Sequence, residues 1–211
     1  MAQQLTSAPG RGGGGCRFAP GLTLGEARAR LFALGGLGED GGYDDAWVKL
    51  KLWRVPLAFP NTEGRRRAVR FHDLHHVLTE YPTTWRGEFE IAAWEVAGGI
   101  RRYWVAWLLD LLGFACGLVV FPRAVYRVFV RGRHSRNLYG EAWDESILTR
   151  RVGEVRHRLK LDVEEARPTG DDRIAFVKWA AASVAAYVAT LAVMFVPALA
   201  LAAALWSYFA R

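Results

Sequence analysis

The last part of the chain constrains the fold most, because residues 179–210 contain no charged side chain. A helix of that length rises about 48 Å, more than the roughly 30 Å hydrocarbon core of a bilayer. We therefore expect a transmembrane helix over residues 174–210, since a small soluble core cannot cover so long an apolar run. One long helix kinked at Pro197 is favoured over a hairpin at this proline, because the polar residues of a tight turn are absent.

Positive charge is concentrated ahead of this apolar run. The chain has 28 Lys and Arg against 21 Asp and Glu, a net charge of +7. Basic residues outnumber acidic ones ten to four over residues 123–160, whereas only Arg211 is charged beyond Lys178. The positive-inside rule then predicts that residues 1–178 lie in the cytoplasm. No zinc-finger or RNA-binding signature accompanies the charge, so a nucleic-acid partner is not expected.

The remaining sequence predicts an all-α fold, a helical domain with a C-terminal transmembrane segment. Residues 1–22 are rich in Gly and lack the apolar core of a secretory signal, so we expect a disordered tail. A helical domain over residues 23–165 and a linker over 166–173 should follow. Only two cysteines are present, Cys16 and Cys116. They exclude a disulfide framework and a cysteine zinc ribbon.

Start and stop signals locate helices within the predicted domain. Thr23 is a candidate N-cap for a first short helix that stops at the Gly35-Gly36 pair. A second helix contains three histidines and should end near Pro82, since the residue before proline is pushed out of the helical region. A third is expected from about Thr84 to Ala97. An amphipathic helix is expected over residues 141–162.

Two segments are harder to assign from their patterns. Residues 47–60 alternate too irregularly for an assignment. Residues 103–122 are apolar enough to cross a bilayer but carry Asp110, so the hydropathy alone leaves their placement open.

The three histidines lie within five positions and carry the candidate chemistry. His72 and His76 are one helical turn apart, so both imidazoles project from one face. Asp73 borders that face, and an antiparallel return after Pro82 would bring Glu88 opposite it. Two imidazoles and two carboxylates suit Zn²⁺, Fe²⁺ or Mn²⁺. The alternative is a solvated polar face without a ligand.

Several known histidine patterns do not fit this cluster. A zincin protease needs a glutamate where Asp73 stands. An HD-type phosphohydrolase needs a histidine well upstream of His72, and none precedes it. A membrane desaturase needs further histidine boxes, but only His134 and His157 remain. His75 points away from the His72 and His76 face by the helical period, so it is left out of the ligand set.

One known pattern has all of its residues present at the required spacing. It is His72-Asp73-x-x-His76, followed by eleven residues and then Glu88. This HDxxH-x11-E spacing resembles the Coq-four family of coenzyme Q (ubiquinone) biosynthesis proteins. The surrounding stretch "HDLHHVLTEYPTTWRGEFEIAAWE" and the later region "RGRHSRNLYGEAWDESILTRRVGEVRHRLKLD" are also similar to that family. The resemblance covers roughly residues 24–162, and the family's usual domain lacks the C-terminal span.

The resemblance implies an α-helical domain that holds one divalent ion through His72, Asp73, His76 and Glu88. Zinc is the default ion, with iron or manganese as alternatives. The implied function is membrane-associated ubiquinone biosynthesis, with oxidative decarboxylation of a polyprenylated aromatic precursor by a metal-dependent decarboxylase-type lyase. The alternative is a non-catalytic scaffold or prenyl-lipid-binding protein of a quinone biosynthesis complex, with a structural metal.

The resemblance also bears on residues 103–122. If this segment crossed the bilayer, the metal motif and the closing region would lie on opposite faces. We therefore expect a core or membrane-contacting helix here, with Asp110 facing protein or headgroups. Expected partners are a polyprenylated quinone precursor, membrane lipid and other quinone-biosynthesis proteins.

Overall fold

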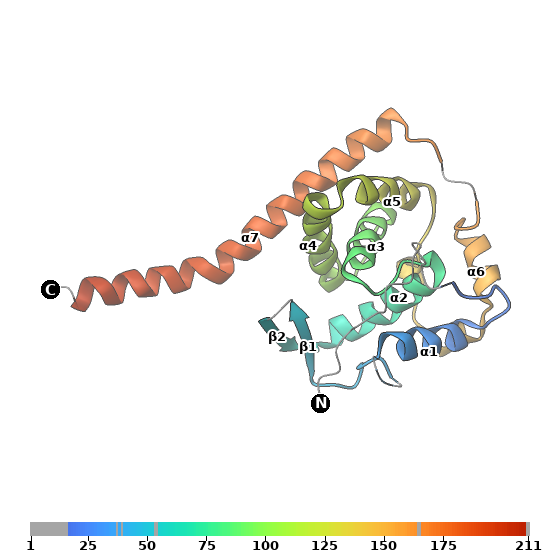
Figure 1. The fold of residues 1–211 in the computed structure, drawn as a ribbon, viewed down its shortest axis with the longest axis horizontal. Helices are drawn as coiled ribbons and strands as arrows, with labels where there is room; N and C mark the ends of the chain where they lie inside the picture. Colours follow the sequence, from blue (N-terminus) through green and yellow to red (C-terminus); the bar gives the residue numbers. More distant parts are fainter. Residues whose placement is uncertain (1–16, 37, 39, 53–54, 164–165, 210–211) are drawn as a thin grey trace.

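In the computed structural model the chain is mainly helical (Figure 1), which confirms the predicted all-α class. The structure describes residues 17–209 apart from 37, 39, 53–54 and 164–165. The α-helices are α1 (Leu24–Gly35), α2 (Glu63–Thr79), α3 (Trp85–Gly98), α4 (Trp104–Val120), α5 (Pro122–His134), α6 (Val152–Arg158) and α7 (Gly170–Phe209). Two 3₁₀ helices, η1 (Leu138–Gly140) and η2 (Glu145–Thr149), lie between α5 and α6.

Helix α3 lies between α4 and α5 and forms the centre of the domain (Figure 1). The largest fully buried side chains come from several helices: Trp94, Phe71, Phe114, Phe129 and Tyr139. Burial of apolar surface, to which these aromatic side chains contribute, is the main favourable term in folding.

The predicted helix signals are confirmed where a capping residue is present. Thr23 and Glu26 form a capping box at the start of α1. Thr84 accepts a hydrogen bond from the Gly87 N–H at the start of α3. Helix α2 ends at Thr79, followed by Glu80 in the left-handed region with φ 64°. The chain therefore leaves α2 just before Pro82, as predicted.

The single helix predicted over residues 141–162 is wrong. The structure has η2 and the short α6 there, separated by an extended segment at Arg150 and Arg151. The backbone N–H of Leu24 donates to Arg150 O, and the N–H of Val152 donates to Leu22 O. These bonds to the N-terminal segment replace helical ones, because a backbone group that pairs elsewhere cannot also join the i to i−4 ladder.

The bounds of the predicted tail also change. Residues 1–16, the larger part of the expected disordered tail, lie outside the described residues. Phe18 is buried, so the packed domain starts before residue 23. Residues 47–60, left unassigned by the sequence, form an antiparallel pair of strands, β1 (Trp47–Leu52) and β2 (Val55–Pro60).

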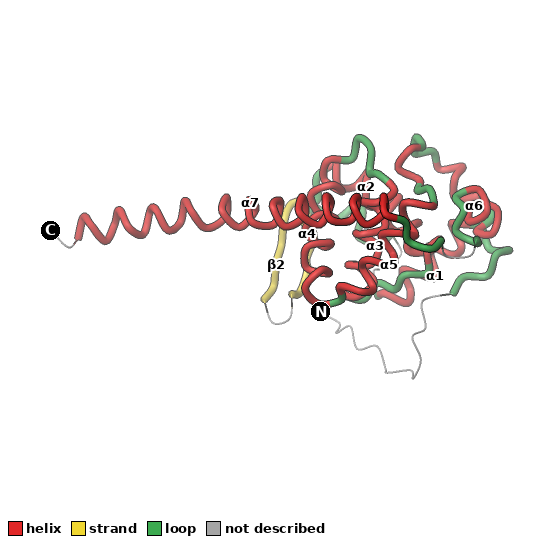
Figure 2. The backbone as a smooth tube through the Cα atoms, turned by 90° about the horizontal axis from the view of Figure 1, so that it is seen from above, coloured by secondary structure: helices red, strands yellow, loops and turns green. Residues whose placement is uncertain are grey.

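Helix α7 is the long apolar element that the sequence predicts. It starts at Gly170, within the expected linker, and continues unbroken through position 197 to Phe209, so the described residues form no hairpin. Gly170–Val196 is long and apolar enough to cross a membrane, and almost none of it is buried against the domain. Figure 2 shows α7 projecting well beyond the other helices. Its composition and exposure fit membrane association.

Candidate metal centre

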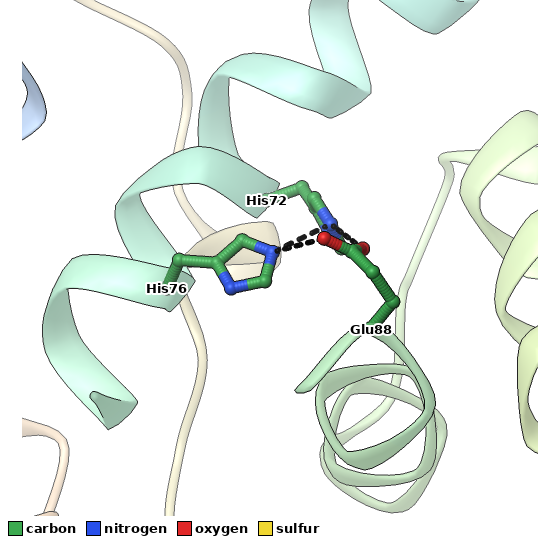
Figure 3. A group of neighbouring side chains, drawn as sticks. All are labelled: His72, His76 and Glu88. Atoms are coloured by element: carbon green, nitrogen blue, oxygen red, sulfur yellow. Dashed lines mark hydrogen bonds and ion pairs between the residues drawn. The ribbon is translucent and has the colours of Figure 1, made fainter. Parts of the chain in front are cut away.

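Three of the predicted ligands converge between α2 and α3 (Figure 3). His72 and His76 project from successive turns of α2, and their Nε2 atoms lie 3.2 Å apart. Glu88 reaches them from α3, with Oε2 3.4 Å from His72 Nε2 and Oε1 3.4 Å from His76 Nε2. Two nitrogen lone pairs and a carboxylate therefore face one point from opposite helices.

The turn between the two helices sets the position of Glu88. A Cβ atom at Gly87 would lie 1.8 Å from the Pro82 carbonyl oxygen, so only glycine permits this close approach. Thr84 caps α3 at the same turn. Glu88 consequently falls in the first turn of α3, on the side that faces the imidazoles of α2.

Hydrogen bonds on the far side of each imidazole fix its tautomer. His76 Nδ1 lies 2.9 Å from the Tyr81 carbonyl oxygen, which only accepts, so Nδ1 carries the proton. His72 Nδ1 lies 3.2 Å from the Glu95 carboxylate and donates in the same way. In the neutral form of both rings, Nε2 then keeps its lone pair for the shared point. Metal-binding histidines are commonly oriented by such outer partners.

Glu95 organises the interior behind the candidate centre. Its fully buried carboxylate accepts hydrogen bonds from His72 Nδ1, from His75 Nδ1 at 2.5 Å and from the Tyr139 hydroxyl at 3.1 Å. Burial opposes the charge on Glu95, but His72 and His75 outweigh it and hold the pKa of Glu95 well below its usual range. Glu95 therefore stays ionised and acts as the common acceptor.

Sequence reasoning missed Glu95, although a signal was present. Glu95 follows Glu88 by seven residues, two helical turns, which places both carboxylates on one face of α3. The sequence left His75 out of the ligand set, and the structure gives it a different partner. His75 is fully buried, and its Nε2 accepts a hydrogen bond from the Leu138 N–H at 2.9 Å. Burial lowers the pKa of His75, so the ring is neutral and braces Glu95.

The electrostatics of the centre favour a cation. Burial disfavours a charged His72, but the carboxylates of Glu95 and Glu88 outweigh it and raise the pKa of His72 well above its ordinary value. Burial acts against the charge of Glu88 too, yet His76 and His72 lower its pKa. The same field that retains a proton here would stabilise a metal ion.

Asp73, the fourth predicted ligand, does not join the three convergent side chains. Its buried carboxylate accepts a 2.5 Å hydrogen bond from the Tyr43 hydroxyl. Burial raises the pKa of Asp73, partly offset by the nearby His72. Coordination by Asp73 stays a prediction.

Asp110 lies inside the protein rather than at headgroups. Its carboxyl group, together with His72 and Glu95, forms a second group of atoms within 4.8 Å of one another. Burial and the adjacent charge of Glu95 raise the pKa of Asp110 well above its usual range. Among the described residues, its Oδ2 atom has no hydrogen-bond partner. Asp110 therefore belongs to the buried group of side chains around Glu95.

The spacing of the three convergent side chains can be compared with that of a zinc site. Zinc binds His nitrogen at about 2.0–2.1 Å and carboxylate oxygen at about 2.0–2.2 Å in tetrahedral geometry, which separates neighbouring ligand atoms by roughly 3.3–3.5 Å. The two Nε2 atoms lie 3.2 Å apart, and each lies 3.4 Å from a different oxygen of the Glu88 carboxylate. The donor set and its spacing therefore fit one divalent ion.

Comparisons of this chain with protein-family models, with curated proteins and with solved structures found no match. The resemblance to the Coq-four family therefore rests on the residues of the motif.

Proposed function

We propose that this chain is a membrane-associated, metal-dependent enzyme of ubiquinone biosynthesis whose divalent cation is held by His72, His76 and Glu88. The observation that carries the proposal is the convergence of two Nε2 lone pairs and one carboxylate at mutual distances of 3.2–3.4 Å. Zinc is the default ion for this borderline donor set, with iron or manganese as alternatives. Asp73 is the fourth residue of the HDxxH-x11-E motif and lies beside these three ligands.

The number of convergent donors favours an enzyme over a scaffold with a structural metal. Structural zinc sites are closed by four protein ligands, whereas catalytic sites use three and keep one position open. Two histidines with one glutamate is a catalytic set. Glu88 keeps 37% of its side chain exposed, so the centre is reachable from solvent.

The proposed substrate is a polyprenylated aromatic acid related to 4-hydroxybenzoate. Its ring carboxyl group plus one water would give a ring hydroxyl, carbon dioxide, two protons and two electrons. Dioxygen is the proposed acceptor of those electrons. A bound divalent ion would supply Lewis-acid stabilisation of negative charge on ring or carboxylate oxygens. The apolar α7 supports a lipid-soluble substrate, because it fits a location where such molecules concentrate.

The first experiment measures metal in the purified full-length protein and in the His76→Ala variant. We expect about one divalent ion per chain in the parent and its loss in the variant. His157→Ala is the matched control, because His157 is 84% exposed and pairs with Asp162, away from the centre. Equal metal content in all three proteins would contradict the assigned ligands.

The second experiment tests the reaction in a host that lacks this gene. The proposal predicts accumulation of a prenylated ring that still bears its carboxyl group, and restoration of quinone synthesis by the parent chain but not by His76→Ala. If His76→Ala lost metal yet restored quinone synthesis, the enzyme assignment would fail and the scaffold alternative would stand. Accumulation of an unrelated lipid would reject ubiquinone biosynthesis altogether.

A further inference from the structure

Helix α4 has an apolar face whose large side chains are exposed near both ends of the helix, whereas residues 110–118 between them are buried or half-buried. Its one charged residue, Asp110, is buried. The exposed large side chains lie at helical spacing along the opposite face: Trp104, Leu108, Leu109, Val119 and Val120. Val119 and Trp104 are the most exposed, at 83% and 69%. Exposed apolar side chains of this size at both ends of one helix are costly in water and mark a contact.

The position of α4 relative to α7 indicates what that contact is. Trp107 of α4 stacks on Trp179 of α7 at 5.0 Å, and from Val184 to Val196 the large apolar side chains of α7 are exposed. Both views place α4 on the side of the helical domain toward which α7 projects (Figures 1 and 2). A bilayer crossed by α7 would therefore meet this side of the domain first.

Basic residues flank the apolar face at both ends. Arg101 and Arg102 are exposed immediately before α4. Beyond its other end, a shallow depression of about 570 Å³ is lined by Arg86, Phe121, Pro122, Arg123, Ala124 and Arg127. An apolar helix face between arginines is the pattern of a helix that lies in the membrane interface, with cations at the level of the lipid phosphates.

We propose that α4 lies in the interfacial plane of an anionic bilayer, and that Arg123 and Arg127 hold phospholipid phosphate groups. The occupant is the lipid surface rather than a protein, because α4 packs beside the apolar α7 and its flanking arginines complement anionic headgroups. This inference rests on the proposed membrane association and is independent of the metal.

The test measures the depth of spin labels in the full-length protein reconstituted into vesicles of phosphatidylcholine and phosphatidylglycerol. With Cys16 and Cys116 replaced by alanine, single labels are placed at Val119→Cys, Leu34→Cys or Val193→Cys. Leu34 is 70% exposed on α1 and serves as the aqueous control, and Val193 is the control for insertion of α7. Collision with lipid-soluble oxygen and with a water-soluble nickel complex reports the depth of each label.

The proposal predicts that the label at 119 behaves like that at 193, with a severalfold higher ratio of oxygen to nickel collisions than at 34. A label at 119 that is as accessible to nickel as that at 34, while 193 is buried in lipid, would overturn it. If the label at 193 were itself in water, the membrane association would fail instead.

The arginines are tested in the same vesicles. Arg123→Glu with Arg127→Glu should move the label at 119 toward water, and so should vesicles of phosphatidylcholine alone. Added inorganic phosphate should leave the depth unchanged, and its release of the label would reject lipid as the occupant. A depth insensitive to charge reversal and to lipid charge would reject the phosphate contacts.

Discussion

Two regions of this protein reverse the usual distribution of side chains. Between α2 and α3, ionisable groups lie inside the domain, with Glu95 and His75 fully buried. Along α4 and α7, large apolar groups lie outside it. The core of a soluble protein normally excludes ionisable groups, and its surface normally carries few large apolar patches.

The difference between the regions is how each arrangement is compensated within the chain. The interior groups are largely satisfied by one another, since Glu95 accepts from two imidazoles and a phenol. The exterior groups are apolar and exposed, so they are stabilised by an apolar phase outside the domain. One region therefore points to a small cation and the other to a lipid bilayer.

The largest expected effect comes from breaking the interior network at Glu95. Glu95→Gln leaves buried donors without their charged acceptor, so we expect the free energy of unfolding to fall by about 3–5 kcal/mol. Urea unfolding in detergent, followed by tryptophan fluorescence, measures it. Glu154→Gln is the control, because Glu154 is exposed on α6. A loss no greater than in this control would mean that Glu95 is not the organising acceptor.

The next effect comes from the turn that positions Glu88. Gly87→Ala places a methyl group against the Pro82 carbonyl, so we expect a loss of about 1–3 kcal/mol together with weaker cation binding. Gly140→Ala meets no atom within 4 Å and should change stability by less than about 0.5 kcal/mol. Equal stability and equal zinc affinity in the two variants would show that the turn does not set the site.

A smaller effect separates the role of Asp73 from that of Glu88. Asp73→Asn should lower zinc affinity about 10- to 100-fold, the range for a residue that supports the ligands, and Glu88→Gln should lower it further. Titration calorimetry on the two variants gives the order. A greater loss in Asp73→Asn would place Asp73 among the direct ligands, in contrast to its observed bond to Tyr43.

The smallest effect is expected on the outer surface. Val119→Ser should change the stability of the domain in detergent by no more than about 0.5 kcal/mol, because Val119 is exposed. Val125→Ser, at a fully buried position of α5, should cost about 1.5–3 kcal/mol. Comparable losses at the two sites would mean that α4 packs against protein on its outer face.

Local signals in the sequence predicted the parts of this fold that local chemistry determines. Thr23, Thr84 and Pro82 mark helix ends through capping and backbone restriction, and His72 and His76 share a face through the helical period. The bridge between Thr23 and Arg151 joins segments far apart in the sequence and left no local signal. Glu95 was not predicted from the sequence, because its role depends on which helix α3 faces, and its spacing from Glu88 gives a face of α3 but not the partners.

The most direct test of the central claim is a calorimetric zinc titration of the metal-stripped full-length protein beside Glu88→Gln and His157→Ala. The account predicts one tight site per chain in the parent and in His157→Ala, and its loss in Glu88→Gln. A parent chain that takes up no zinc, iron or manganese, or a Glu88→Gln variant that binds as tightly as the parent, would contradict a metal centre between α2 and α3.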